Sequence, residues 1–117
     1  VIVPAYPQEG RRTVGGYQLV RGIPVERTSM ARDPLFPVRL SHIPTLLREA
    51  VREMHDGDIV GSIELSTVLH GAGPILVKLN ELIKEGKKLV VVDATTTEDL
   101  EQIVLAIEKS QKTARVL

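Results

Sequence analysis

A flexible glycine and an arginine stand just beyond an apolar segment at the start of this chain. Residues 1–3 are apolar and precede two prolines, which stop a strand because proline lacks a backbone donor and fixes its own φ. Gly10 and Arg11 follow, so that backbone and guanidinium can approach an anion closely. Ligands of open α/β sheets bind outside the carboxyl ends of the strands. We therefore expect a binding loop at residues 4–11; the alternative is that Arg11 pairs with Glu9.

A second candidate residue, Asp93, ends the clearest strand of the sequence, residues 88–93. The unbroken apolar run of that strand is typical of a parallel strand covered on both faces. A carboxylate at its end is well placed to bind ligand hydroxyls or a metal ion. The alternative, equally open, is that Asp93 caps the next helix together with the threonines at 95–97.

The remaining side chains show no catalytic or metal-binding pattern. His42, His55 and His70 lack metal-ligand spacing, and the absence of cysteine excludes disulfides, thiol nucleophiles and cysteine metal sites. The Gly-Ala-Gly at residues 71–73 lacks the Gly-x-Gly-x-x-Gly pattern and a P-loop lysine. We expect a tight turn there, we predict no metal site, and the sequence leaves the catalytic group unassigned.

Composition limits the possible partners of the chain. With 117 residues it is one domain at most, and 3% aromatic residues indicate a core of Val, Ile, Leu and Ala. Fifteen basic residues balance fifteen acidic ones, which gives no general attraction to nucleic acid or to a membrane. No apolar run approaches the roughly 20 residues of a transmembrane helix. We expect a cytoplasmic module. The missing initial methionine and the strand-like ends suggest a piece excised from a longer protein.

The first third of the chain is expected to form a small β-hairpin and a loop. Gly15 and Gly16 supply the positive φ of a tight turn between two short strands. Pro24 argues for an edge strand, since proline cannot donate to a ladder. Residues 28–38 contain two prolines, and we expect an ordered loop there instead of a helix.

Alternating helices and strands follow from Ser41, the expected N-cap of a helix that carries Pro44 in its first turn and extends to Met54. The later elements are a strand at 59–65, a turn at 68–74, a helix ending at Gly86, the strand at 88–93, a helix opened by Thr95, Thr96 and Thr97, and a strand at 113–117. This alternation predicts an α/β fold: a three-layer αβα arrangement with a mainly parallel sheet, plus a small β-hairpin excursion near the N-terminus.

Four separated motifs resemble one known family. They are Pro-Ala-Tyr-Pro-Gln-Glu-Gly-Arg at 4–11, Thr-Val-Gly-Gly at 13–16, Ala-Arg-Asp-Pro-Leu-Phe-Pro-Val at 31–38, and Val-Asp-Ala-Thr at 92–95 with Glu-Asp-Leu at 98–100. Together they resemble the four-carbon acid sugar kinase family, in the second half of its N-terminal sugar-binding domain. Two positions depart from the family: Phe36, where a polar residue is usual, and Tyr17, where histidine is common.

The resemblance implies a site for a sugar acid. Such a ligand offers a carboxylate, which suits a guanidinium, and hydroxyls, which suit carboxylates. Arg32 and Asp33 have two equally open roles: they contact the substrate, or they form an internal ion pair that holds the loop in shape. The substrate-binding residues implied are Gly10, Arg11, Arg32, Asp33 and Asp93.

The resemblance also implies the activity of a longer protein. In this family a sugar-binding domain precedes a nucleotide-binding domain, and the protein phosphorylates threonate, erythronate or 3-oxo-tetronate with ATP. Residues 1–117 would then be a partial sugar-binding domain, without the family's Asp-Asp-Leu-Thr-Gly-Ala first-strand motif. We expect it to be inactive alone, with ATP and Mg²⁺ bound mainly outside it and with the sugar acid and the nucleotide-binding domain as its partners.

Two alternatives stay open at this stage. One is a non-enzymatic small-acid-binding or structural α/β module. The other is a folding fragment that pairs its exposed sheet edges in a homo-oligomer, because such edges template association.

Overall fold

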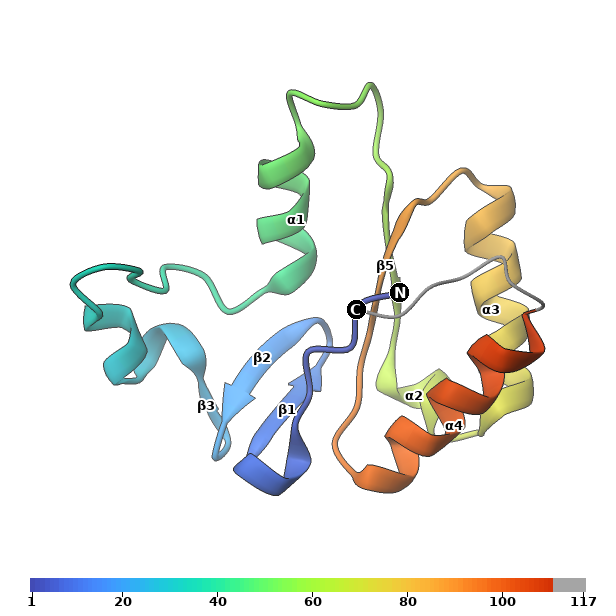
Figure 1. Cartoon of the computed structure of the whole chain (residues 1–117), viewed down its shortest axis with the longest axis horizontal. Coiled ribbons are helices and arrows are strands. Elements are labelled where there is room, and N and C mark those ends of the chain that lie inside the picture. The colour runs from blue at the N-terminus through green and yellow to red at the C-terminus, as the bar shows by residue number, and fades with distance from the viewer. Residues whose placement is uncertain (111–117) are drawn as a thin grey trace.

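A parallel sheet with helices on either side forms the body of the computed structural model, which describes residues 1–110 (Figure 1). Strands β4 (Val60–Ile63) and β5 (Leu89–Val92) pair in parallel. The chain start adds to the other edge of β5, where Ile2 N–H donates to the Val90 carbonyl at 2.7 Å and Val92 N–H to the Ile2 carbonyl at 3.0 Å. The strand expected at residues 1–3 is therefore a single parallel bridge in the described structure.

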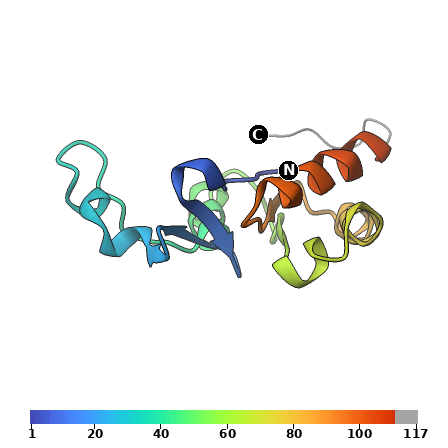
Figure 2. The ribbon, with the colours of Figure 1, turned by 90° about the horizontal axis from the view of Figure 1, so that it is seen from below.

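The helices flank the parallel sheet, as the α/β prediction requires. Helix α1 (Ile43–Val51) lies on one side of β4 and β5, while α3 (Ala72–Lys84) and α4 (Thr97–Lys109) pack against each other on the other side (Figures 1 and 2). A short helix, α2 (Leu65–Val68), connects β4 to α3. The α/β class with a parallel sheet and a separate hairpin is thus confirmed.

The core between the parallel sheet and α3 and α4 is aliphatic. Burial of each such side chain contributes about 1.5–3 kcal/mol, so this layer supplies most of the apolar stabilisation. The layer's large, fully buried side chains include Ile63, Val68, Ile75, Leu79, Val92 and Ile103. Among residues 1–110 no helix is long and apolar enough to cross a membrane.

The hairpin forms a second, antiparallel sheet beside the carboxyl ends of the parallel strands. Its order is β1 (Arg11–Val14), β2 (Tyr17–Val20) and β3 (Ile23–Pro24). Gly15 and Gly16 connect β1 to β2 at φ +60° and +77°, which confirms the predicted tight turn. The proline of β3 lies on the edge strand, also as predicted.

Residues 25–40, here called the arm, extend away from both sheets (Figures 1 and 2). The arm holds two short 3₁₀ helices, η2 (Val25–Arg27) and η3 (Ser29–Arg32), followed by an irregular segment. No α-helix forms there, in agreement with the loop expected at 28–38.

Several predicted boundaries were wrong for reasons of tertiary structure. Ser41 does not cap α1: its Oγ accepts the Glu26 N–H at 3.1 Å and its own N–H donates to Glu26 Oε2 at 2.7 Å, so it ties the arm to the body. Helix α1 begins after His42 and ends at Val51, short of Met54. The strand expected at 59–65 is shorter, because α2 starts at its last position. The strand predicted at 113–117 lies outside the described residues.

Candidate functional site

The buried carboxylate of Asp93 is the centre of the carboxyl-end region of the parallel sheet. Only 2% of the residue is exposed. Its Oδ2 accepts the N–H groups of Gly15 at 2.6 Å and Leu65 at 3.0 Å, and its Oδ1 accepts the N–H of Gly16 at 2.9 Å. Three segments that are distant in sequence are therefore joined at one side chain.

Local backbone geometry explains why these donors converge. Two successive residues of positive φ, Gly15 and Gly16, turn their N–H groups toward the same side and form a concave anion site. Leu65 is the first residue of α2, where N–H groups have no partner inside the helix. The carboxylate of Asp93 satisfies all three donors, and among residues 1–110 no ion pair joins it to a cation.

Asp93 does not cap α4, so that alternative was wrong. The cap is Thr96, whose Oγ1 accepts the Asp99 N–H at 3.1 Å, while Asp99 Oδ2 accepts the N–H groups of Thr95 at 2.8 Å and Thr96 at 3.1 Å. Burial raises the pKa of Asp99, but the hydrogen bonds from Thr95 and Thr96 outweigh it and hold the pKa below its usual range. The three threonines and the acids of the first turn thus open α4 as predicted, with Asp99 as the capping carboxylate.

The hairpin is tied to the chain start and to α1 by side chains that the sequence reasoning did not select. Thr13 is fully buried and donates from Oγ1 to Gln18 Oε1 at 2.8 Å, and Gln18 Nε2 donates to the Pro4 carbonyl at 3.1 Å. The rings of Tyr17 and His42 lie 4.7 Å apart. No sequence spacing signals these contacts, since each depends on how the hairpin folds back.

Gly16 packs closely against the start of α1, and this gives a first prediction. A Cβ there would lie 2.9 Å from Pro44 Cδ and 3.0 Å from His42 Nε2, at φ +77°. Gly22 has φ +80° but no atom within 4 Å of its would-be Cβ, so Gly22→Ala carries the backbone cost alone, about 1 kcal/mol. We expect Gly16→Ala to lower the free energy of unfolding by about 2–3 kcal/mol, because overpacking adds to that cost. Urea unfolding measures the loss of stability for Gly16→Ala and Gly22→Ala. Equal losses for the two variants would contradict the close packing at Gly16.

Gly10 and Arg11 lie at the other end of β1 from this turn. Gly10 has φ +71°, ends the 3₁₀ helix η1 (Pro7–Glu9), and accepts the Arg21 N–H at 2.8 Å through its carbonyl. Arg11 is exposed at the start of β1, and within the described part of the chain no ion pair joins it to Glu9. The guanidinium of Arg11 is therefore available to an anion from solution.

Arg32 and Asp33 lie on the arm, away from Asp93 (Figure 1). Both are exposed, and in residues 1–110 no ion pair connects them. Asp33 Oδ1 instead accepts the N–H groups of Leu35 and Phe36, each at 2.8 Å. The hydrogen bonds from Phe36 and then Leu35 hold the pKa of Asp33 below its usual range. The fold thus brings Asp93 to the hairpin and leaves this pair apart from it.

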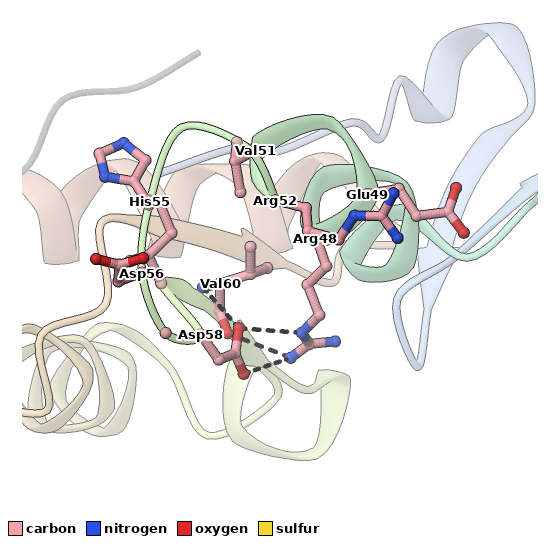
Figure 3. A pocket seen from close by; sticks show the side chains of 10 residues that line it. Arg48, Glu49, Val51, Arg52, His55, Asp56, Asp58 and Val60 are labelled. Atoms are coloured by element: carbon pink, nitrogen blue, oxygen red, sulfur yellow. Dashed lines mark hydrogen bonds and ion pairs between the residues drawn. The ribbon is translucent and has the colours of Figure 1, made fainter.

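A cavity of about 490 Å³ lies at the opposite end of the sheet, where α1 ends and β4 begins, and it contains none of the predicted site residues (Figure 3). Arg48 and Asp58 face each other there, with Nε to Oδ1 at 3.1 Å and Nη2 to Oδ2 at 3.3 Å. Lys87 Nζ lies 3.1 Å from Asp58 Oδ2. In the view of Figure 3, His55 and Asp56 lie apart from this ion pair. Of the residues that line the cavity, Arg48 and Asp58 pair with each other, and we assign this ion pair a structural role.

The ion pair of Asp58 predicts a pH dependence of stability. Hydrogen bonds from Arg48, the Val60 N–H and Lys87 lower the pKa of Asp58 from 3.8 to about 2. A carboxylate with a depressed folded pKa contributes stability that is complete above its unfolded pKa and is lost as the pH falls toward the folded one. Because 48% of the side chain is exposed, we expect less than about 1 kcal/mol from it.

Urea unfolding above pH 3.8 and near pH 2 measures this contribution. Asp58→Asn should reduce the loss of stability between the two conditions. Asp56→Asn, at a neighbouring exposed carboxylate without an ion pair among residues 1–110, should leave that loss unchanged. An identical pH dependence of wild type and Asp58→Asn would show that the pair adds nothing to stability.

Comparison with known proteins identifies the family. The model of a family described as the sugar-binding N-terminal domain matches residues 1–117. This chain belongs to that family. A D-erythronate kinase of Heliobacterium modesticaldum is 43% identical over 103 residues, which is 88% of this chain and 22% of that protein. A D-threonate kinase of Bordetella bronchiseptica is 36% identical over 107 residues, 92% of this chain and 22% of that protein.

Solved structures agree with the fold of this sugar-binding domain. A Haemophilus influenzae protein superposes with a TM-score of 0.76 at 26% identity, covering 91% of this chain and 24% of its own. A Bordetella bronchiseptica domain with bound citrate, described as a domain-swapped dimer, has a TM-score of 0.69 at 31% identity, covering 98% of this chain and 25% of its own. The domain therefore spans about a quarter of the length of the relatives that it matches.

Proposed function

We propose that this chain binds the acceptor substrate of an ATP-dependent kinase for four-carbon acid sugars. The observation that carries the proposal is the match of residues 1–117 to a sugar-binding N-terminal domain. The relatives named as D-erythronate, D-threonate and 3-oxo-tetronate kinases support the substrate class. Residues 1–117 are then part of the sugar-binding domain of a longer protein.

Arg11 is the proposed anchor for the carboxylate of the sugar acid. Its guanidinium is exposed at the start of β1, and a planar guanidinium pairs bidentately with a carboxylate. The positive φ of Gly10 and the lack of a side chain leave the backbone beside it open to the ligand.

Asp93 contributes mainly by holding the hairpin. An ionised carboxylate offers about four acceptor positions, and the N–H groups of Gly15, Gly16 and Leu65 use three of them. We assign the remaining acceptor position to a ligand hydroxyl. Arg32 and Asp33 lie on the arm, away from Asp93. In this proposal they contact the sugar acid only if the arm approaches it within the longer, assembled protein.

Phosphoryl transfer itself is proposed for the longer protein. The described residues contain no group of three or more His, Asp or Glu side chains able to hold a metal ion. In this proposal ATP and Mg²⁺ bind mainly outside this chain, in a nucleotide-binding domain that is its partner, where they would supply the phosphoryl group and its charge neutralisation. Such transfers depend on positioning, so the residues of this chain bind the acid and orient its hydroxyls. The compartment proposed is the cytoplasm.

Calorimetric titration of the chain tests the proposal. D-erythronate and D-threonate should bind, whereas erythritol, which has four hydroxyls but no carboxylate, should bind much more weakly. Equal affinity for the acids and the polyol, or no binding of either acid, would contradict an acid-binding role for this chain.

A further inference from the structure

Arg21 has a backbone conformation that is unfavourable for an arginine. Its φ is +51°, and among residues 1–110 it is the one non-glycine residue with a positive φ. Arg21 and Gly22, the latter at φ +80°, form the two-residue turn between β2 and β3, because Val20 pairs with Ile23. Such a turn needs positive φ at both central residues, and Asn, Asp or Gly usually occupies the first of them. The turn therefore explains the conformation at position 21 but not the choice of an arginine.

The side chain of Arg21 contacts Gly10, the residue that precedes the proposed anchor Arg11. The Arg21 N–H donates to the Gly10 carbonyl at 2.8 Å, and a Cβ added at Gly10 would lie 3.2 Å from Arg21 Cγ. The register of β1 and β2, which pairs Arg11 with Val20, places Gly10 opposite Arg21 when it is continued by one residue. Residues directly opposite in antiparallel strands lie about 5 Å apart between Cα atoms. The two arginines thus flank Gly10, one along the chain and one across the hairpin.

Neither of these two guanidinium groups is neutralised within the described part of the chain. Arg11 and Arg21 are both exposed, and no ion pair joins either of them to an acid among residues 1–110. The side chains of residues 1–25 comprise three arginines and one acid, Glu9, a net charge of +2 in a chain whose overall charge is zero. Neighbouring like charges repel each other. An anion bound between the two arginines would relieve that repulsion.

We propose that Arg21 is a second guanidinium of the acid site and that Arg11 and Arg21 together bind the carboxylate of the sugar acid. This inference rests on the proposed function and adds a binding residue to it. A carboxylate offers about four acceptor positions, so one guanidinium pairs with it bidentately while the other donates to the positions that remain. The missing side chain of Gly10 leaves room for Arg21 beside the anchor. In this arrangement the strained backbone of Arg21 places a cation where the ligand binds.

Replacing Arg21 by asparagine should stabilise the chain and weaken acid binding at the same time. Asparagine tolerates positive φ, and Asn-Gly is a preferred pair in this kind of turn, so the urea midpoint should rise. The affinity for D-erythronate should fall about 10-fold or more, because hydrogen bonds to a charged group are lost. A residue that only supports the fold would change stability in the opposite direction. Urea unfolding and calorimetric titration therefore separate the two roles.

Arg39→Asn is the matched control for the loss of one positive charge. Arg39 is an exposed arginine of the arm, without an ion pair in the described structure and without a positive φ. Its replacement should leave the affinity for D-erythronate within a factor of about two, and the urea midpoint should not rise. Arg21→Lys keeps the charge but not the planar fork, so its affinity should lie between those of wild type and Arg21→Asn.

The outcomes distinguish this inference from the proposed function. If Arg11→Gln weakens binding but Arg21→Asn binds D-erythronate as tightly as wild type, the second guanidinium is wrong and the acid site stands. Equal losses of affinity for Arg21→Asn and Arg39→Asn would overturn the inference as a general charge effect. A fall in both stability and affinity for Arg21→Asn would overturn it in favour of a structural role. A wild type that binds neither D-erythronate nor D-threonate would contradict the proposed function itself.

Discussion

Replacing Asp93 by alanine is expected to lower the free energy of unfolding by about 3 kcal/mol or more. The substitution leaves the N–H groups of Gly15, Gly16 and Leu65 without their acceptor in a region where Asp93 itself is 2% exposed. Each buried donor without a partner costs about 1–3 kcal/mol. The turn between β1 and β2 and the start of α2 should loosen together. Urea unfolding followed by circular dichroism measures the loss.

Two other substitutions give this experiment its controls. Asp93→Asn keeps the shape of the side chain and one carbonyl acceptor, so we expect it to lower the free energy of unfolding less than alanine does. Some loss remains, because the new NH₂ group faces a backbone N–H donor. Asp99→Ala removes a capping carboxylate that is 6% exposed, and loss of a cap costs about 1 kcal/mol. A loss for Asp93→Ala no larger than that for Asp99→Ala would show that the three N–H groups find other partners.

Replacing Arg11 by glutamine is expected to weaken binding of D-erythronate by about 10-fold to 100-fold. Hydrogen bonds to a charged group contribute about 1.5–3 kcal/mol, and each 1.4 kcal/mol is a factor of ten in affinity. Because Arg11 is exposed and has no ion pair among the described residues, the free energy of unfolding should change by less than about 0.5 kcal/mol. Calorimetric titration and urea unfolding together separate binding from stability.

Arg12 supplies the matched control for this prediction. It is equally an exposed arginine of β1, but the alternation of a strand turns it to the opposite face from Arg11. Arg12→Gln should leave the affinity for D-erythronate within a factor of about two. Arg11→Lys should restore only part of the affinity, since an ammonium does not pair bidentately. Equal losses for Arg11→Gln and Arg12→Gln would indicate a general charge effect and no specific anchor.

Features set by local sequence were predicted well. The Gly15 and Gly16 turn, the edge position of Pro24 and the N-cap of α4 follow from backbone preferences of a few neighbouring residues. The parallel β5 follows from its unbroken apolar run, because such runs are stable only when both faces are covered.

Features that depend on distant parts of the chain were not predictable in this way. Asp93 lies 78, 77 and 28 residues from its donors Gly15, Gly16 and Leu65, so no local pattern reveals that its carboxylate is already occupied. Ser41 is likewise drawn from helix capping to the arm by Glu26. The sequence identifies residues whose side chains could bind a ligand. The topology of the fold decides which of these residues lie close together.

Acid binding at the hairpin is tested most directly by following the backbone amides of the ¹⁵N-labelled chain by NMR while D-erythronate is added. We expect the largest shifts at Gly10 and Arg11, where β1 begins, and at Gly15 and Gly16, which bind Asp93 after the end of β5. Erythritol at the same concentration should produce much smaller shifts. Shifts centred instead on the Arg48 and Asp58 cavity at the opposite end of the sheet, or no shifts with the acid, would contradict it.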